Sequence, residues 1–220
     1  MPTAVFDMIG TFFSLEGLRP RLSALGAPER TLELWFAEAL RDFIALSHAG
    51  GYAPIQEVLG AALPRTLLQV GLDDVESSRC ARVLEGMKAL EPAPGAHEAC
   101  ERLTREGWKL LALTHGSESS TRALLARAGL LDAFGAVLST DDVRTTKPHP
   151  SVYAMARPFL EGEAWMVAAH GWDLTGAKRA GMRTAWVSRK EQRWLEVLPP
   201  PDIRGPDLAA VALALSTHSY

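Results

Sequence analysis

Ala4-Val5-Phe6-Asp7-Met8-Ile9-Gly10-Thr11 begins as a short apolar run, which ends in a carboxylate and continues into a Gly-Thr turn. The apolar residues predict a buried strand, and Asp7 then stands at its carboxyl end, where open α/β sheets bind their ligands. A Mg²⁺-dependent phosphoryl-transfer site needs further acidic oxygen ligands nearby, but the residue two positions later is Ile9. The stretch therefore predicts a nucleophile-like aspartate without the usual metal partner.

The composition is that of an ordinary globular chain. Its 220 residues, 47% hydrophobic and 22% charged, suffice for one sizeable core and a smaller subdomain. The formal net charge of -3 gives no reason to expect nucleic acid as a partner. No signal-peptide pattern opens the sequence, and no apolar run approaches the roughly 18 residues of a membrane span. We therefore expect a cytoplasmic protein with a small-molecule partner and no membrane partner, and leave a homodimer open.

The hydrophobic periodicity changes along the chain. Residues 16–90 have the spacing of helices, with one apolar stripe formed by Leu34, Phe36-Ala37, Leu40 and Ile44-Ala45. From residue 92 onward, strand-like runs alternate with amphipathic stretches. The predicted strands cover 110–113, 136–138, 165–169 and 184–187, and the predicted helices include 119–128 and 175–180.

Alternating strands and helices predict an α/β fold whose parallel sheet is covered on both faces. The strand at 4–6 must join that sheet, so the helical block is an insertion after the first strand. Pro92-Ala93-Pro94-Gly95 marks the return, because this sequence cannot continue a helix. We therefore expect a Rossmann-like parallel-sheet core, residues 1–14 and 93–220, with a helical cap, residues 15–92, inserted after the first strand.

Four short motifs follow predicted strands, at the edge of the sheet where a common cleft would lie. They are Asp7 with Thr11, Thr114-His115-Gly116-Ser117, Lys147-Pro148 and His170-Gly171-Trp172-Asp173. In the second motif, Ser117 is placed to cap the following helix and to leave backbone N–H groups facing the cleft.

In this order and spacing, the four motifs resemble those of the haloacid dehalogenase superfamily. Asp7, Thr114, Lys147 and Asp173 occupy the places of its four motif residues, and the resemblance covers nearly the whole chain, including the cap. Phosphatases of the superfamily carry acidic residues where this chain has Ile9 and Ala169. The chain is most similar to the metal-independent 2-haloacid dehalogenase branch, whose Trp-Asp and Gly-Ala pairs it matches at 172–173 and 176–177.

The resemblance implies a hydrolase that removes halogen from a small 2-haloacid without metal or cofactor. Asp7 would attack the carbon that bears the halogen, and water would hydrolyse the resulting ester. Lys147 would keep Asp7 ionised, while Thr11 and Thr114 would orient its carboxylate. Asp173, with or without His170, would orient or deprotonate the water.

The candidate substrate-binding residues depart from the branch at one important place. These candidates are Ile9, Phe36, Arg41, His115, His170 and Trp172, with Trp35 as a further wall. In the branch an arginine follows the Leu-Trp pair of the cap, but here Leu34-Trp35 is followed by Phe36. Arg41 lies roughly 140° around the helix from Phe36. Either Arg41 or a histidine replaces the arginine, or the substrate is not a short haloacid.

Two other functions stay open at this point. One is a hydrolase on the same scaffold that acts on another activated substrate, including a phosphatase with an atypical metal site. The other is a catalytically silent member that binds a small acid, or a partner protein through its cap. The presence of Asp7 and Lys147 argues against the silent member, whereas Phe36 argues for it.

Overall fold

Six parallel strands form the central sheet of the computed structural model, which describes residues 1–73 and 75–218. They are β1 (Thr3–Asp7), β4 (Lys109–Thr114), β5 (Phe134–Ser139), β6 (Ala164–Ala168), β7 (Arg183–Val187) and β8 (Ile203–Gly205), in the order β5-β4-β1-β6-β7-β8. β1 lies between β4 and β6, with Val5 opposite Leu111 on one side and Met166 on the other. The predicted parallel α/β sheet is therefore confirmed, while β8 was not predicted.

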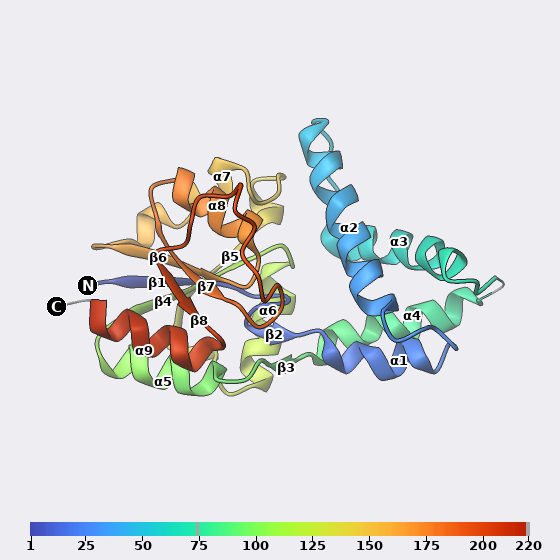
Figure 1. Cartoon of the computed structure of the whole chain (residues 1–220), viewed down its shortest axis with the longest axis horizontal. Helices are drawn as coiled ribbons and strands as arrows, with labels where there is room; N and C mark the ends of the chain where they lie inside the picture. Colours follow the sequence, from blue (N-terminus) through green and yellow to red (C-terminus); the bar gives the residue numbers. More distant parts are fainter. Residues whose placement is uncertain (74, 219–220) are drawn as a thin grey trace.

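The side chains of β1 alternate between the two faces of the sheet, as a doubly covered strand requires. Ala4 and Phe6 enter one apolar cluster and Val5 enters the other. Helices α5 (Ala96–Arg105) and α9 (Leu208–His218) cover the first face, and α7 (Pro150–Ala154) and α8 (Gly171–Arg179) cover the second (Figure 1). α6 (Glu118–Arg127) follows the carboxyl end of β4.

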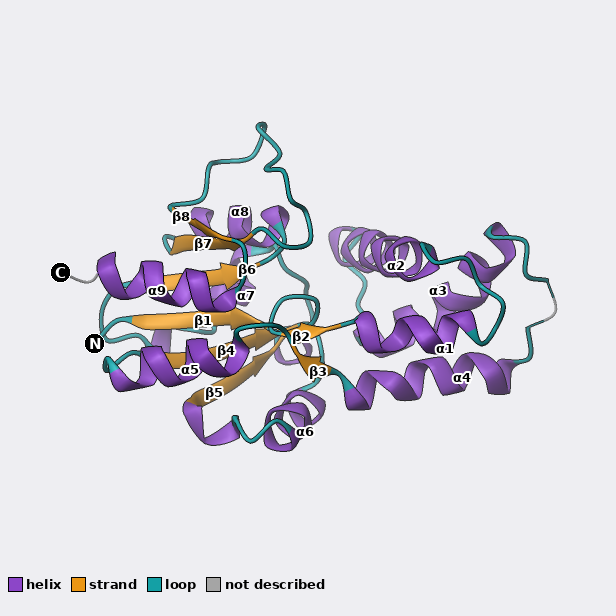
Figure 2. Cartoon of the chain, turned by 60° about the horizontal axis from the view of Figure 1, so that its bottom comes forward, coloured by secondary structure: helices purple, strands orange, loops and turns teal. Residues whose placement is uncertain are grey.

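The helical insertion, residues 15–92, leaves the sheet after β1 and returns before α5. It contains α1 (Arg19–Ser23), α2 (Thr31–His48), α3 (Ile55–Gln69), α4 (Ser77–Glu85) and the 3-10 turn η2 (Gly86–Ala89). Two short strands, β2 (Phe13–Ser14) and β3 (Glu91–Pro92), pair antiparallel and connect it to the sheet (Figure 2). That 15–92 and the remaining residues are separate domains stays a prediction.

The buried face of α2 differs from the stripe predicted around Leu34. Leu32, Trp35, Ala39 and Phe43 are buried, whereas Leu34 is 38% exposed. The two bulky rings set the orientation of the helix, because burying them removes the largest apolar areas from water. Of the predicted stripe, Leu40 is buried, whereas Leu34, Ala37 and Ala45 are exposed, so the prediction was wrong for these three.

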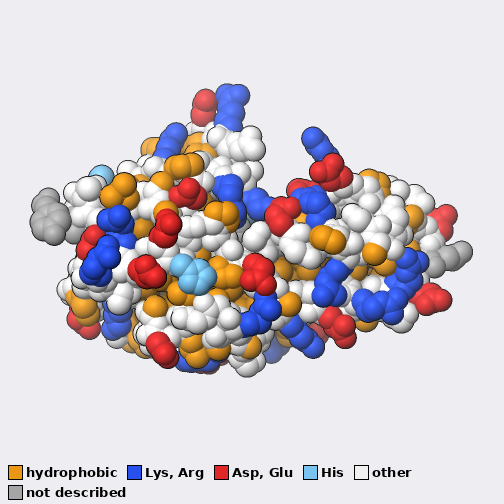
Figure 3. All heavy atoms as spheres, turned by 90° about the horizontal axis from the view of Figure 1, so that it is seen from below, with side chains coloured by type: hydrophobic (Ala, Val, Ile, Leu, Met, Phe, Trp, Pro, Cys, Tyr) orange, Lys and Arg blue, Asp and Glu red, His pale blue; other side chains and the backbone are white. Residues whose placement is uncertain are grey.

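No helix among residues 1–73 and 75–218 is long and apolar enough to cross a membrane. Acidic and basic side chains are interspersed on the face seen in Figure 3, which runs from α5 and α9 to the helical insertion. This mixed pattern accords with the small formal net charge of -3.

Candidate active site

Three charged side chains meet at the carboxyl ends of β1 and its neighbours. The Lys147 Nζ donates to Asp7 Oδ1 and to Asp173 Oδ2, each at 2.9 Å. The side chains of Lys147 and Asp173 are fully buried, and that of Asp7 is 8% exposed. Three of the predicted catalytic residues thus form one charged cluster, in which Lys147 bridges Asp7 and Asp173. Asp7 and Lys147 are 140 residues apart in the sequence.

Neutral hydroxyl donors hold the remaining carboxylate oxygens. The Thr11 Oγ1 donates to Asp7 Oδ2 at 2.6 Å and accepts from the backbone N–H of Ala169 at 2.9 Å, which fixes the direction of its hydrogen. The Tyr153 hydroxyl lies 2.7 Å from Asp173 Oδ1 and 2.9 Å from the Asp173 carbonyl oxygen, and donates to them. Thr11 therefore joins the predicted cluster, and Tyr153 is a member that the sequence analysis missed.

Gly176 was the sequence signal that could have pointed to Tyr153. A Cβ at Gly176 would stand 2.5 Å from the Tyr153 hydroxyl and 2.6 Å from Pro148 Cβ. Only a residue without a side chain lets α8 approach α7 this closely. A glycine within the helix that follows the Trp-Asp pair thus indicates a bulky partner packed against that helix.

Burial and neighbouring charges shift the pKa values of the three charged groups in different directions. Burial alone would raise the pKa of Asp7, but Lys147, together with His170 and Thr11, holds that pKa well below its usual range. Burial raises the pKa of Asp173, and the Asp7 charge adds to the effect while Lys147 opposes it. Burial would lower the pKa of Lys147, yet the two carboxylates raise it. Asp7 is therefore ionised at neutral pH, and Lys147 stays protonated.

Two imidazole rings stack against the indole of Trp172. The ring centroids of His115 and Trp172 are 5.8 Å apart at 3°, and those of His170 and Trp172 are 5.4 Å apart at 21°. The backbone N–H of Lys147 donates to His115 Nε2 at 3.0 Å, so the hydrogen of the neutral ring is on Nδ1. Burial and the nearby Lys147 lower the pKa of His115 to about 3. His115 is thus a neutral donor at pH 7.

His170 lies against the loop that carries Asp7. Its Nδ1 is 3.6 Å from Asp7 Oδ2, too long for a hydrogen bond, and this buried atom has no hydrogen-bond partner among the residues described. Gly10 makes room for the ring: a Cβ there would stand 2.9 Å from His170 Cε1, and Gly10 has a φ of 89°. The imidazole is consequently held next to Asp7 with a free nitrogen.

Thr114 does not hold the Asp7 carboxylate as predicted. Its hydroxyl accepts from the backbone N–H of Gly116 at 3.0 Å and lies 3.4 Å from Thr121 Oγ1. It therefore supports the turn between β4 and α6. The predicted cap of α6 is confirmed, because Ser117 Oγ accepts from the backbone N–H of Ser120 at 3.2 Å.

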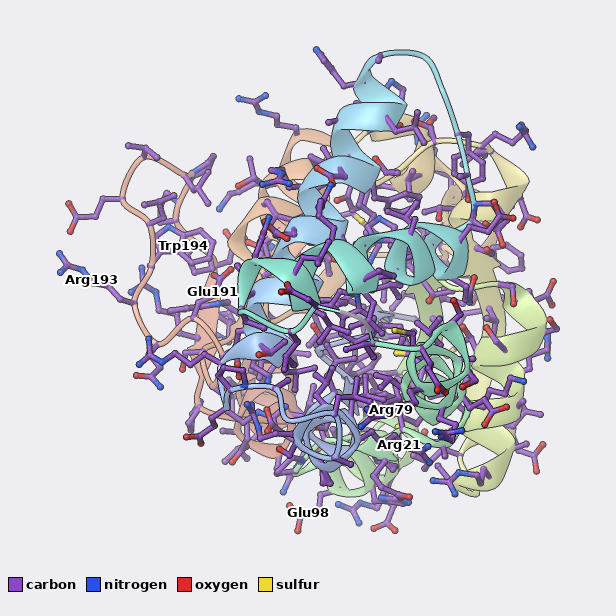
Figure 4. The ribbon with its side chains drawn as sticks, turned by 90° about the vertical axis from the view of Figure 1, so that its right-hand side faces the viewer. Arg21, Arg79, Glu98, Glu191, Arg193 and Trp194 are labelled. Atoms are coloured by element: carbon purple, nitrogen blue, oxygen red, sulfur yellow. The ribbon has the colours of Figure 1, made fainter. Side chains whose placement is uncertain are left out.

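The loop after β7 supports the His170 to Asp173 segment from outside. Glu191 accepts from the backbone N–H of Gly171 at 3.1 Å, at the first residue of α8. A carboxylate is favourable at this end of a helix. Figure 4 shows Glu191, Arg193 and Trp194 on this loop, where Trp194 is buried and Arg193 exposed. α8 begins before Asp173, so Asp173 does not cap it.

A cavity of about 320 Å³ opens from Asp7 between the sheet and the helical insertion. The predicted residues that line it together with Asp7 are Ile9, Phe36, His115, His170 and Trp172. Two predictions were wrong here. Arg41 does not line the cavity, because its side chain is 61% exposed and bonded to Asp42. Trp35 is fully buried in the core of the insertion, where its Nε1 donates to the carbonyl of Leu59 at 2.9 Å.

Other arginines of the insertion are also held away from the cavity. Arg21 donates to the carbonyl of Arg82 at 2.8 Å, and Arg79 donates to the carbonyl of Ala24 at 2.9 Å. Figure 4 shows Arg21 and Arg79 near one another, and their bonds join the region of α1 to α4. Their guanidinium groups therefore stabilise the insertion.

The donor set around Asp7 does not fit a magnesium ion. Lys147, Thr11 and Tyr153 already occupy each oxygen of Asp7 and Asp173 at 2.6 to 2.9 Å. Mg²⁺ demands several oxygen ligands in octahedral geometry. Ile9 and Ala169 offer no side-chain oxygen. A dication here would have to displace a buried ammonium.

Known proteins resemble the chain over most of its length. A family model described as haloacid dehalogenase-like hydrolase matches residues 1–181. An (S)-2-haloacid dehalogenase from Pseudomonas sp. (strain YL) is 29% identical over 217 residues, 96% of this chain and 93% of the relative. Another, from Xanthobacter autotrophicus, is 33% identical over 196 residues, 87% of this chain and 76% of the relative. The solved structure of L-2-haloacid dehalogenase from Xanthobacter autotrophicus with chloropropionic acid covalently bound has a TM-score of 0.85 and 27% identity, covering 97% of each chain.

Proposed function

The chain belongs to the haloacid dehalogenase-like hydrolase family, and we propose that it is a metal-independent hydrolase that cleaves the carbon–halogen bond of a 2-haloacid through Asp7. The observation that carries this proposal is an ionised carboxylate that lines a cavity and is bonded to a buried ammonium. The curated relatives that carry the name (S)-2-haloacid dehalogenase support the reaction type. The solved relative with covalently bound chloropropionic acid supports an enzyme-bound intermediate.

In the first step, a carboxylate oxygen of Asp7 attacks carbon 2 of the substrate from the side opposite the halogen. A carbon–oxygen bond forms, and the halide leaves with the electron pair of the carbon–halogen bond. The low pKa of Asp7 keeps the attacking group ionised. Displacement from the opposite side inverts the configuration of carbon 2. The enzyme then carries the substrate as an ester of Asp7.

In the second step, water attacks the carbonyl carbon of that ester. We assign the general base to His170, because it lines the cavity and its Nδ1 lies next to Asp7 without a partner. The oxygen of the tetrahedral intermediate is stabilised by Lys147 or Thr11, which donate to the carboxylate before the reaction. When the intermediate collapses, His170 returns the proton to the departing 2-hydroxy acid.

Asp173 has a positioning role in this proposal. It is fully buried, and both of its oxygens are taken by Lys147 and Tyr153. His170, by contrast, lines the cavity, and its side chain is 14% exposed. Asp173 fixes the ammonium of Lys147 at the oxygen where negative charge develops. This assignment replaces the earlier expectation that Asp173 handles the water.

The reaction is tested by halide release from fluoro-, chloro- and bromoacetate and from both enantiomers of 2-chloropropionate. We expect turnover of at least one acid by the wild-type protein and none by Asp7→Asn. Asp142→Asn is the matched control, because Asp142 is exposed and outside the cavity. If no acid loses halide, or if Asp7→Asn remains active, the proposed function is wrong.

The role of His170 is tested separately by the intact mass of the protein during turnover. His170→Gln replaces the imidazole with a polar amide that has no basic nitrogen, so the Asp7 ester should form and then persist. We expect a mass increase equal to the substrate without its halide. If the variant hydrolyses the ester as fast as wild type, another group activates the water.

The helical insertion acts as a cap over Asp7 in this proposal. Phe36 and Leu40 of α2 and Leu59 of α3 line the cavity, which supports such a role. The core assignment of 1–14 and 93–220, the cytoplasmic location and the homodimer stay predictions.

A further inference from the structure

We propose that the preferred substrates are 2-haloacids in which carbon 2 carries an apolar chain or ring, rather than haloacetates or 2-halopropionates. This inference rests on the proposed function and specifies its substrate class. It follows from the part of the cavity that lies beyond the charged cluster.

The distant part of the cavity has apolar walls. Its lining residues there are Leu40, Ile55, Leu59, Leu84, Met87 and Leu124. They come from α2, α3, α4, η2 and α6, elements that contribute none of the charged cluster. Leu59 and Leu124 are almost fully buried, while Leu84 and Met87 are half-buried. Apolar walls of this kind bind hydrocarbon by removing it from water.

The cavity is also too large for a two-carbon acid. Its volume of about 320 Å³ lies at the lower end of the range for pockets that hold drug-sized ligands. A haloacetate has few heavy atoms, and at roughly 30 Å³ each, the volume of a water in the liquid, it fills less than half of this space. The remainder suffices for about five more heavy atoms by the same measure.

The rim of the cavity gives no reason to expect a second charged group on the substrate. Gln56, Glu85 and Lys88 are the exposed polar residues of the lining. Glu85 and Lys88 carry opposite charges three positions apart, so neither sign dominates. Ala81, also exposed, completes this side of the rim. An uncharged tail can therefore extend from carbon 2 towards the rim.

The missing cap arginine makes the tail more important. Phe36 stands where the resemblance places that arginine, and Arg41 is bonded to Asp42 on the solvent side. A substrate without a guanidinium partner must obtain its affinity from other contacts. Each methylene that enters the apolar part should lower the KM about fourfold, the effect of removing one CH₂ group from water.

The first test measures halide release from 2-bromopropionate, 2-bromobutyrate, 2-bromohexanoate and 2-bromooctanoate. We expect the KM of the wild-type protein to fall along this series until the cavity is filled. Ala81→Phe narrows the rim side and should raise the KM for 2-bromooctanoate at least tenfold, with less than twofold change for 2-bromopropionate. Ala123→Phe is the matched control, since Ala123 is exposed on α6 and outside the cavity. A KM that does not fall with chain length overturns the inference.

The second test does not need turnover. Calorimetric titration of the wild-type protein with acetate, butyrate, hexanoate and octanoate measures binding without reaction. The differences between these acids give the contribution of the tail. Tighter binding of the longer acids, weakened by Ala81→Phe and not by Ala123→Phe, supports the apolar site even if no haloacid is cleaved. In that case only the proposed reaction fails. Equal affinity for all four acids overturns the tail site even if haloacids are cleaved.

Discussion

Replacing Lys147 with methionine should lower the free energy of unfolding by about 3 to 5 kcal/mol at pH 7, the usual loss when one partner of a buried ion pair is removed. The ammonium is fully buried, and its Nζ lies 2.9 Å from both Asp7 and Asp173. Methionine has a similar volume but no charge, so two adjacent carboxylates would keep only the hydroxyls of Thr11 and Tyr153. Little water can compensate, because Asp173 is fully buried.

The loss should be smaller at pH 5 than at pH 7. Burial already raises the pKa of Asp173 in the intact cluster, and removal of Lys147 raises it further. Below its folded-state pKa the carboxyl is neutral, so the penalty for burying an unpaired charge disappears. Urea unfolding, followed by circular dichroism at both pH values, measures the two differences between variant and wild type.

Lys109→Met is the matched control for this substitution. Lys109 pairs with Glu161 at 3.4 Å on the surface, with exposed side-chain fractions of 25% and 55%. Such a pair contributes less than about 1 kcal/mol, so the control should stay close to wild type at both pH values. If Lys147→Met were no more destabilising than Lys109→Met, or if its loss did not depend on pH, the account of the charged cluster would be refuted.

Three further predictions concern the metal, the anion and the imidazole. Halide release should persist in excess EDTA, since the oxygens of the charged cluster are already bonded to protein donors; strict dependence on added Mg²⁺ would contradict this. Phe36→Arg should strengthen the binding of chloroacetate by about 1.5 to 3 kcal/mol, the size of a charged hydrogen bond, and so lower its KM by roughly tenfold to hundredfold. Arg41→Ala should leave the KM unchanged, because Arg41 is 61% exposed. His115 has a folded-state pKa of about 3 against 6.5 in the unfolded chain, so unfolding takes up a proton in this range. The contribution of the neutral His115 to the free energy of unfolding is therefore complete above pH 6.5 and falls on acidification by up to about 1.4 kcal/mol per pH unit. In urea unfolding, the free energy of unfolding of His115→Gln should depend less steeply on pH between 6.5 and 5 than that of the wild type.

The charged cluster was predictable from the sequence because parallel strands end at one edge of the sheet. Asp7, Lys147 and Asp173 each follow a strand-like run or its turn, so the fold class alone brings them together. The structure agrees, with Lys147 between the two carboxylates. The same reasoning could not orient Thr114, whose hydroxyl has a local partner in the Gly116 N–H and takes it.

The cap was harder to predict because a helix can turn either of two apolar sides inward. Leu34 and Phe36 gave α2 one stripe, and Trp35 and Phe43 gave it another. Only the contacts with α3, such as the Trp35 bond to the Leu59 carbonyl, select between them. A rotation of this kind changes which side chains line the cavity.

Side-chain contacts between residues far apart in the sequence could not be predicted. Tyr153 bonds to Asp173 across 20 residues, and Ser47 of α2 accepts from the backbone N–H of Thr146 at 3.2 Å, next to Lys147. No periodicity encodes such pairs. Their positions depend on how α7 packs on α8, and on how the insertion meets the loop before Lys147.

The central claim is that Asp7 forms a covalent ester, and one measurement tests it most directly. The wild-type protein, in excess over a haloacid it cleaves, is allowed a single turnover in water enriched in oxygen-18. Because water attacks the ester at the aspartyl carbonyl, the peptide containing Asp7 should carry the heavy oxygen, and the hydroxy acid should carry none. Heavy oxygen in the hydroxy acid alone, with an unlabelled Asp7 peptide, would mean that water attacks carbon 2 directly and would contradict the account.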